Sequence, residues 1–252
     1  MADKGHITRV KTNSIPSCLK LRIKLKEPCK LRVVAINPVI SSAIYYDREF
    51  TAELDNKLEI RLPQSSKSLD VIVLCQKGDS NIKSVSIKKV GLRQFPVCYK
   101  TKTVREFIPF AQSIADKLST LSVGDYKSKD GTFHIQVMDN ISGTGTPARI
   151  HNDLGFIQIS KDKMGKNTVP MNMAILLHEY SHFYENVIQK DEIEADLNGL
   201  RIYLGLGYPI LELHKSFTEV FGYADNEMNR ERYDYIFAYV SKFNKLKHKT
   251  CI

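Results

Sequence analysis

The chain has 252 residues, of which 42% are hydrophobic and 26% are charged. This composition is typical of a globular protein with enough chain for one large domain or two small ones, and it excludes a disordered or collagen-like chain. The longest apolar runs, residues 71–75 and 174–177, are far shorter than the roughly 20 residues of a membrane-spanning helix. We therefore expect no partner in a membrane.

The five cysteines are odd in number and form no CxxC pair, which argues against a disulfide scaffold and against a structural zinc ribbon. The first 14 residues lack the apolar segment of a signal peptide. We therefore expect reduced thiols and a cytoplasmic location rather than secretion through a signal peptide.

Positive charge is concentrated in the first part of the chain. Residues 1–103 contain 20 Lys or Arg and 9 Asp or Glu, which gives 20 − 9 = +11, whereas residues 104–252 contain 17 and 19, which gives 17 − 19 = −2. Such a shift indicates a domain boundary. The sequence therefore predicts a basic domain over residues 1–103 and a second domain over residues 104–252.

The first domain has the pattern of an antiparallel β-sandwich. Apolar residues alternate with basic ones over residues 19–25, which is typical of a strand with one buried face. Similar segments recur without helices between them, at residues 31–36, 58–62, 69–75 and 85–90. Three of the cysteines lie among these strands, where we expect them to pack as small apolar side chains: Cys18, Cys29 and Cys75.

The basic residues of the first strand form a cationic stripe. The stripe contains Lys20, Arg22, Lys24 and Lys26, with Lys30 and Arg32 on the next segment. Such a stripe is either a solvated strand face or a surface that binds nucleic acid or another acidic partner. The sequence leaves both interpretations open.

The second domain is predicted to be α+β. Helical spacing of apolar residues over 104–121 is followed by two short strands, residues 133–137 and 155–160, with a Gly/Thr-rich loop between them. Residues 169–186 are apolar almost all round and predict a buried helix, and a further helix is expected from about residue 191 to the GLGYP segment at 205–209. Helical segments at 217–223 and 232–243 complete this domain.

The segment HEYSH at residues 178–182 carries the most informative pattern. His178 and His182 are four residues apart, so on a helix they project from one face and can bind one metal ion. Neutral imidazoles suit Zn²⁺, and a catalytic zinc has three protein ligands and one open position. Glu179 lies beside the first histidine, where its carboxylate can take a proton from a zinc-activated water.

The third ligand is expected from the next helix. Glu185 lies roughly 10 Å along the helix axis from His178 at 1.5 Å per residue, too far to share one ion with it. Glu192 opens the following helix, so it is the better candidate if the chain reverses over residues 187–190. Asp196, one turn later, is placed to accept the outer N–H of a ligand histidine and to fix its tautomer.

HEYSH followed by EIEAD resembles the gluzincin class of zinc metallopeptidases, in which HExxH is completed by a Glu in an ExxxD or ExxAD helix. The continuation ADLNGLRIYLGLGYP is similar to the corresponding helix in peptidases of the HtpX type, although their membrane spans are missing here. The resemblance covers about residues 150–235. It implies a zincin-like domain that hydrolyses peptide bonds, with His178, His182 and Glu192 as zinc ligands and Glu179 as general base.

The resemblance also implies that strand 155–160 is the edge on which a polypeptide substrate adds as an antiparallel strand. The residue that stabilises the oxyanion is not fixed by the pattern. Its candidates lie after the ligands: His214, Tyr223, Arg230 and Arg232. His214 fits a helix surface better than a catalytic role, and Arg232 fits either an ion pair with the neighbours of Glu179 or a surface cap.

Two other functions remain open. One is a structural or assembly role for the peptidase-like fold, and the stretch HEYSHFYE…EIEAD…LGLGYP is loosely similar to proteins of tailed bacteriophages, which implies a virion role. In that case the basic sandwich would dock to an acidic partner. Alternatively, the sandwich alone binds nucleic acid, with an affinity that falls steeply with salt.

Overall fold

The computed structural model describes residues 5–94, 101–141, 145–210, 212–213, 215 and 227–246. The protein is a mixed α+β structure, as the sequence predicted. It divides into two compact units, residues 1–93 and 94–252. The sequence had placed the boundary at residue 103, where the net charge changes sign, and the first unit ends about ten residues earlier, just after its last strand.

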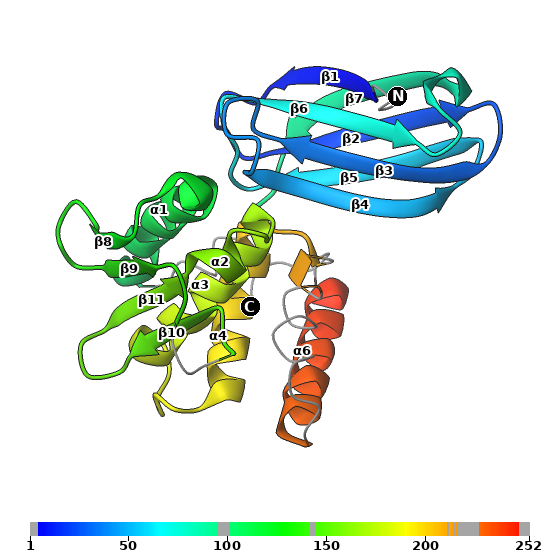
Figure 1. The fold of residues 1–252 in the computed structure, drawn as a ribbon. Coiled ribbons are helices and arrows are strands. Elements are labelled where there is room, and N and C mark those ends of the chain that lie inside the picture. The colour runs from blue at the N-terminus through cyan, green and yellow to red at the C-terminus, as the bar shows by residue number, and fades with distance from the viewer. Residues whose placement is uncertain are drawn as a thin grey trace. The chain divides into compact units, whose positions relative to one another are not determined.

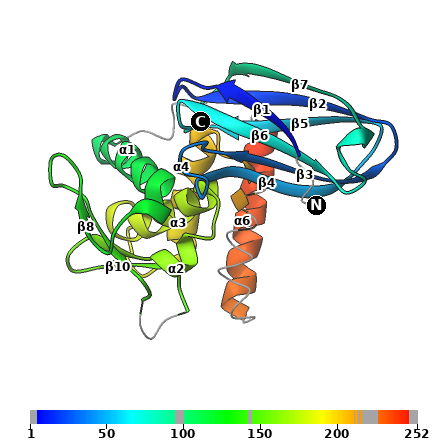
Figure 2. The same cartoon turned by 45° about the horizontal axis from the view of Figure 1, so that its top comes forward.

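The first unit consists of two antiparallel sheets that face each other (Figures 1 and 2). One sheet has the strand order β1-β6-β3-β4, and the other has the order β5-β2-β7. The strands are β1 (His6–Lys11), β2 (Ser17–Leu25), β3 (Cys29–Ile36), β4 (Ile44–Ala52), β5 (Asp55–Leu62), β6 (Ser68–Cys75) and β7 (Ile82–Gly91). This sandwich-like arrangement is the one that the recurring short strands predicted.

Alternating side chains form the core of this unit. In β2, Leu19, Leu21 and Ile23 are fully buried, whereas the basic residues between them are exposed. Burial of one face drives the pairing, because each large aliphatic side chain contributes about 1.5–3 kcal/mol when it leaves water. Three cysteines are buried free thiols among these strands, as expected: Cys18, Cys29 and Cys75.

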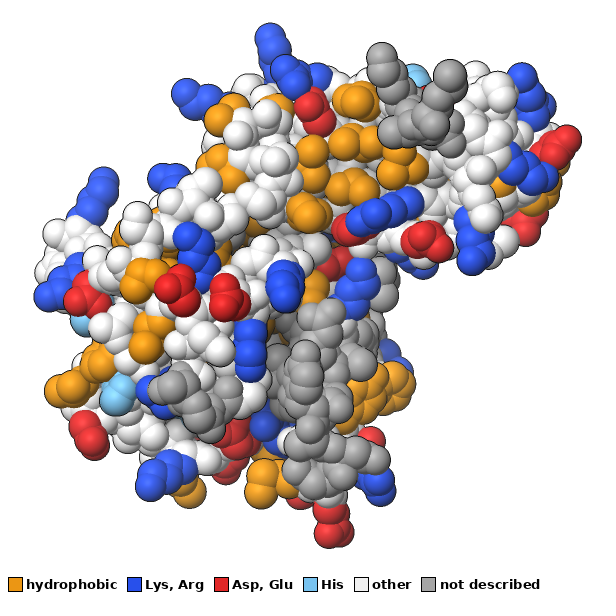
Figure 3. Space-filling model, in the orientation of Figure 1, with side chains coloured by type: hydrophobic (Ala, Val, Ile, Leu, Met, Phe, Trp, Pro, Cys, Tyr) orange, Lys and Arg blue, Asp and Glu red, His pale blue; other side chains and the backbone are white. Residues whose placement is uncertain are grey.

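Strands β1 and β4 were not predicted. They pair with β6 and β3 at the two edges of the four-stranded sheet. The sequence of β4, IYYDREFTA, has a burial pattern that alternates only weakly, so its periodicity gives little signal. Hydrophobic side chains are grouped over β6 and β3 on the outer side of this sheet (Figure 3), and Ile7 of β1 is 60% exposed there.

The second unit has a small sheet with the order β10-β11-β9-β8 and helices packed around it (Figure 1). The strands are β8 (Gly124–Lys127), β9 (His134–Met138), β10 (Ala148–His151) and β11 (Phe156–Ser160). The helices are α1 (Lys102–Lys117), α2 (Lys161–Met164), α3 (Val169–Tyr184), α4 (Glu192–Leu206) and α6 (Glu227–Leu246). Helix α3 contacts α1, α4 and the strands β10 and β11, so it forms the centre of the unit.

One prediction for this sheet is wrong. Residues 155–160 were expected to form its edge, but β11 pairs in parallel with β9 and in antiparallel with β10. The edge beside α3 is β10, which begins in the segment that the sequence analysis interpreted as a loop. Its four residues are too few for a periodic signal, and a hairpin through residues 152–155 brings it alongside β11.

None of the helices in the described part of the chain combines the length and the apolar character needed to cross a bilayer. The expected helical segment at 217–223 lies outside the described residues. The segment predicted at 232–243 lies within α6, which begins earlier, at Glu227.

Candidate metal centre

Helix α3 carries the two histidines at its C-terminal end. Thr168 caps its N-terminus by accepting a hydrogen bond from the Met171 backbone N–H, and Pro170 in the first turn has no N–H to leave unsatisfied. Residues 169–177 are all buried, so the helix is fixed by packing on every side. It ends at Tyr184, as the sequence required for the chain to reverse.

The reversal between α3 and α4 is held by side chains. Asp191 caps α4 by accepting a hydrogen bond of 2.9 Å from the Glu194 backbone N–H. The Glu194 carboxylate accepts hydrogen bonds from the backbone N–H groups of Val187 and Ile188 at 3.0–3.2 Å. These contacts fix the reversal and the start of α4, and therefore the position of Glu192 in its first turn.

Gly199 allows α4 to lie directly against α3. A Cβ atom at this position would lie 3.0 Å from the His178 backbone nitrogen and 3.1 Å from the carbonyl carbon and oxygen of Leu177. Only a glycine fits such an approach without displacing the backbone of α3. The sequence analysis did not single out this residue, and its position within the ADLNGL segment is the only signal that pointed to it.

His178, His182 and Glu192 converge on one point, as predicted. Their ligand-type atoms lie within 4.8 Å of one another. The Nε2 atoms of the two histidines are 3.1 Å apart, and the Glu192 carboxylate oxygens lie 3.4 Å from His178 Nε2 and 3.5 Å from His182 Nε2. A tetrahedral zinc with bonds of about 2.0–2.1 Å separates its ligand atoms by about 3.3–3.4 Å. Each of the three distances is close to that spacing, with Glu192 Oε2 facing His178 and Oε1 facing His182.

The other ring nitrogens show why a cation fits there. His182 Nδ1 lies 2.7 Å from the Gln189 carbonyl oxygen, and His178 Nδ1 lies 2.8 Å from the Asp196 carboxylate, although its N–H does not point straight at the oxygen. Both partners accept hydrogen bonds, so each neutral ring carries its proton on Nδ1. Both Nε2 lone pairs then face each other and the carboxylate, an arrangement that is repulsive unless a proton or a metal ion lies between them.

The electrostatics of the metal-free molecule agree with this reading. Burial disfavours a charged imidazole, but the neighbouring Asp196 and Glu192 outweigh that effect and raise the pKa of His178 to about 10. Burial by itself would raise the pKa of Glu192. The two histidines and Arg232 outweigh that effect and lower this pKa well below the usual range. A positive charge is therefore stabilised at this point of the molecule.

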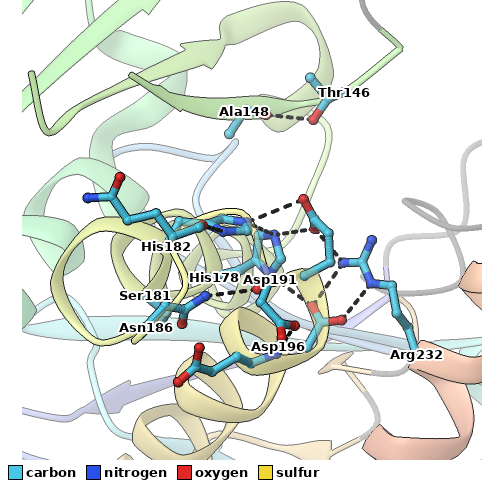
Figure 4. Close-up of polar contacts among 12 residues, drawn as sticks. Thr146, Ala148, His178, Ser181, His182, Asn186, Asp191, Asp196 and Arg232 are labelled. Atoms are coloured by element: carbon cyan, nitrogen blue, oxygen red, sulfur yellow. Dashed lines mark hydrogen bonds and ion pairs between the residues drawn. The ribbon is translucent and has the colours of Figure 1, made fainter. Parts of the chain in front are cut away.

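Arg232 of α6 binds the acidic residues of the site (Figure 4). Its Nε lies 2.7 Å from Asp196 Oδ2, and its Nη2 lies 3.1 Å from Asp196 Oδ1 and 3.1 Å from Glu192 Oε2. Asp196 is 1% exposed, and its buried carboxylate has both His178 and Arg232 as partners. Asp196 lies beside the outer nitrogen of His178, where the sequence placed it, and its role in fixing a metal ligand stays a prediction.

Glu179 lines a cavity together with His178, His182 and Glu192. Its side chain is buried, and burial raises the pKa of its carboxyl group above the usual range, an effect that the charges of His178 and His182 partly offset. The cavity measures about 580 Å³. It is bordered on one side by residues 146–150 of β10 and its approach, and on the other by α3, the reversal and Arg232.

Of the four candidates for oxyanion stabilisation, only Arg232 is placed at the cavity among the described residues. Arg230 is exposed on α6 and does not line the cavity. His214 and Tyr223 lie outside the described residues. Arg232 binds the carboxylates of Asp196 and Glu192. From the sequence, an ion pair near Glu179 was one of the alternatives for this arginine.

Comparisons of the chain with protein-family models, with curated proteins and with solved structures found no match.

Proposed function

We propose that this chain is a zinc-dependent peptidase that hydrolyses peptide bonds in the cavity between α3, α4 and β10. The observation that carries the proposal is the convergence of the two histidines and Glu192. The Nε2 atoms lie 3.1 Å apart, Glu192 Oε2 lies 3.4 Å from His178 Nε2, and Glu192 Oε1 lies 3.5 Å from His182 Nε2. The outer nitrogen of each ring lies beside an acceptor. Two imidazoles and one carboxylate are the ligand set of many catalytic zinc sites, which keep one position open.

When bound, the zinc would polarise the scissile carbonyl and increase the acidity of a water molecule. Glu179 would remove a proton from the attacking water and deliver it to the leaving amine. Its raised pKa suits this task, because a carboxyl group that protonates closer to neutral pH can both accept and release the proton. Asp196 would hold the His178 ring in the tautomer that leaves Nε2 free for the metal.

An extended substrate would pair with β10. This strand is the edge of the sheet beside the cavity, and residues 146–150 line that cavity. The Ser160 backbone N–H donates a hydrogen bond to the Pro147 carbonyl, so these two residues form a hydrogen-bonded pair. Hydrogen-bonded and non-hydrogen-bonded pairs alternate along an antiparallel ladder. The backbone N–H and C=O groups of Ala148 and Ile150 therefore point away from β11. These groups are where an antiparallel substrate strand would add.

The test combines metal analysis with proteolysis of fluorescein-labelled casein by the full chain. We expect one zinc per chain, loss of that zinc in Glu192→Ala, and loss of cleavage with retained zinc in Glu179→Gln. Glu227→Gln, an exposed carboxylate of α6, is the matched control and should cleave at the unaltered rate. Equal rates in Glu179→Gln and the unaltered chain would overturn the mechanism.

A second outcome of the same experiment addresses the alternative function. A chain that binds zinc through Glu192 but cleaves neither casein nor a mixed peptide library would contradict the peptidase proposal. Such a result would favour a structural or assembly role, including one in a virion, in which the metal only stabilises the fold.

A further inference from the structure

The outer face of the three-stranded sheet in the first unit carries an excess of positive charge. In β2 the exposed positions alternate with buried ones, and residues directly opposite each other in an antiparallel pair share a face. The register therefore places six cations on this outer face, which we call the cationic face: Lys20, Arg22, Lys24, Lys57, Arg61 and Lys88. Asp55 and Glu59 lie on the same face, so its net charge is 6 − 2 = +4.

Two pairs of like charges face each other directly across neighbouring strands. Lys20 of β2 is opposite Lys88 of β7, and Arg22 of β2 is opposite Lys57 of β5. Such pairs destabilise a sheet by themselves. The two carboxylates compensate only in part, because Lys20 lies 3.7 Å from Glu59 and Arg22 binds Asp55. This arrangement would be relieved by an anion lying over the face.

Protection against aggregation does not account for the pattern. Lysines on edge strands prevent the pairing of sheet edges, and this applies to β5 and β7. Lys20, Arg22 and Lys24 lie on β2, the central strand, which has no free edge. They also alternate with buried residues, so all three point to the same side of the sheet.

The outer side of the four-stranded sheet is a contrast within the same unit. There Arg9 binds Asp70 with contacts of 2.7 and 2.8 Å, and Arg32 binds Asp47 with contacts of 2.8 and 2.6 Å. Each of these arginines is neutralised by one carboxylate in a bidentate pair. On the cationic face, by contrast, six cations share two carboxylates.

The chemistry of the cationic face selects the kind of anion. Strands β2, β5 and β7, which the structure describes in full, contain no aromatic residue, so the face offers neither a stacking platform for bases nor an aromatic anchor for a protein partner. It offers ammonium and guanidinium groups with the exposed hydroxyls of Ser84 and Ser86 between them. A shallow hollow of about 420 Å³ lies over Lys20, Arg22 and Lys88.

We propose that the cationic face binds the phosphodiester backbone of nucleic acid without reading the bases. Lysine, arginine and serine side chains are the usual partners of phosphate oxygens, and such contacts position a protein without conferring sequence preference. Cations repeat about every 7 Å along β2 and about every 5 Å across the sheet, so several phosphates can be neutralised together. This function is independent of the metal centre.

The experiment measures binding of the full chain to a fluorescein-labelled 20-base-pair DNA by anisotropy at several salt concentrations. A net charge of +4 on the face corresponds to about four phosphate contacts, so log K should fall with log salt with a slope of about −3.6. The variant Lys57→Ser with Lys88→Ser removes one partner from each like-charge pair. It should lower the slope to about −1.8 and weaken binding on the order of 100-fold at 50 mM salt.

Two controls test whether the double variant still folds and whether DNA binding depends only on the net charge of the chain. Because the double variant removes two repulsions, its thermal unfolding midpoint should be unchanged or higher. The matched control, Lys30→Ser with Lys67→Ser, removes the same charge from exposed positions outside the cationic face and should keep the slope near −3.6. Equal loss of binding in the two double variants would overturn the proposal, because only net charge would then matter.

A second probe tests whether the cationic face prefers nucleic acid to an acidic polypeptide. Poly-L-glutamate at the same charge concentration should displace the DNA at least about tenfold less well than unlabelled DNA does, because a duplex releases condensed counterions on binding. Equal displacement by poly-L-glutamate would assign the face to acidic polypeptides and would contradict the nucleic-acid proposal.

Discussion

Arg232 and Asp196 form a bidentate ion pair in which the carboxylate is 1% exposed and the arginine 8% exposed. The same guanidinium reaches Glu192 at 3.1 Å. It therefore joins α6 to the first two turns of α4, at the two residues that orient and complete the proposed metal site. A buried carboxylate next to another carboxylate is costly without a cation, which explains why an arginine lies here.

Removal of this guanidinium should weaken zinc binding. In Arg232→Met, Asp196 and Glu192 lose their shared partner and Glu192 is no longer held toward the histidines. We expect a 10–100-fold loss of zinc affinity, the range for residues that orient metal ligands. Competition with a chromophoric chelator measures it.

Arg230→Met provides the control, because Arg230 lies on the same helix but is exposed. Arg232→Lys separates charge from geometry, since a lysine cannot make the two parallel hydrogen bonds. An affinity for zinc that is the same in all three variants and in the unaltered chain would contradict the positioning role.

Substitution of Gly199 should disturb the packing of α4 on α3. The Cβ of Gly199→Ala would lie 3.0 Å from the backbone nitrogen of His178, so one helix must move. We expect a loss of about 1–3 kcal/mol in the free energy of unfolding, together with weaker zinc binding. Urea denaturation with and without zinc measures both effects.

Gly145→Ala is the matched substitution, because a Cβ there meets no atom within 4 Å. It should change the free energy of unfolding little. If Gly199→Ala were as stable as Gly145→Ala, the close approach of the helices would have no energetic importance.

The pH dependence of stability should reverse when zinc binds. In the metal-free chain the pKa of His178 is raised from 6.5 to about 10 by Asp196 and Glu192, against the effect of burial. A raised pKa gives stabilisation that is complete below pH 6.5 and is lost as the pH rises through 10. The unfolding temperature of the metal-free chain should therefore fall over this window.

Zinc requires the neutral ring, so its binding must displace this proton and should become stronger as the pH rises. Calorimetry in buffers of different ionisation enthalpy should show about one proton released per zinc near pH 8. Asp196→Asn should reduce both the pH dependence and the proton release. Zinc binding without proton release at this pH would contradict the assignment of His178 as a ligand.

The helix cap at Asp191 should matter for the metal site as well as for stability. Asp191→Ala removes the acceptor for the Glu194 N–H and should cost about 0.5–2 kcal/mol. The loss falls on the first turn of α4, which holds Glu192, so zinc affinity should fall too. Asp191→Ser retains an acceptor and should restore most of both; failure of Ser to do better than Ala would contradict the capping role.

Local periodicity predicted much of the fold. The alternation of Leu19 and its neighbours predicted β2, and the uninterrupted apolar run before His178 predicted a buried helix that ends near Asn186, two residues beyond its observed end at Tyr184. Both signals are read from side chains a few residues apart, because a strand repeats every two residues and a helix every 3.6. Strands β1, β4, β8 and β10 were missed, since each is short or alternates weakly.

The sequence by itself determined that His178 and His182 share a helix face and that Glu192 opens the following helix, because these relations follow from helix geometry and a short reversal. Only the tertiary structure decided that β10 is the sheet edge at the cavity, that Gly199 lets the helices touch, and that Arg232 binds Asp196 and Glu192. Each of these depends on contacts between segments far apart in the chain, and local spacing does not specify which distant backbones and charges will meet.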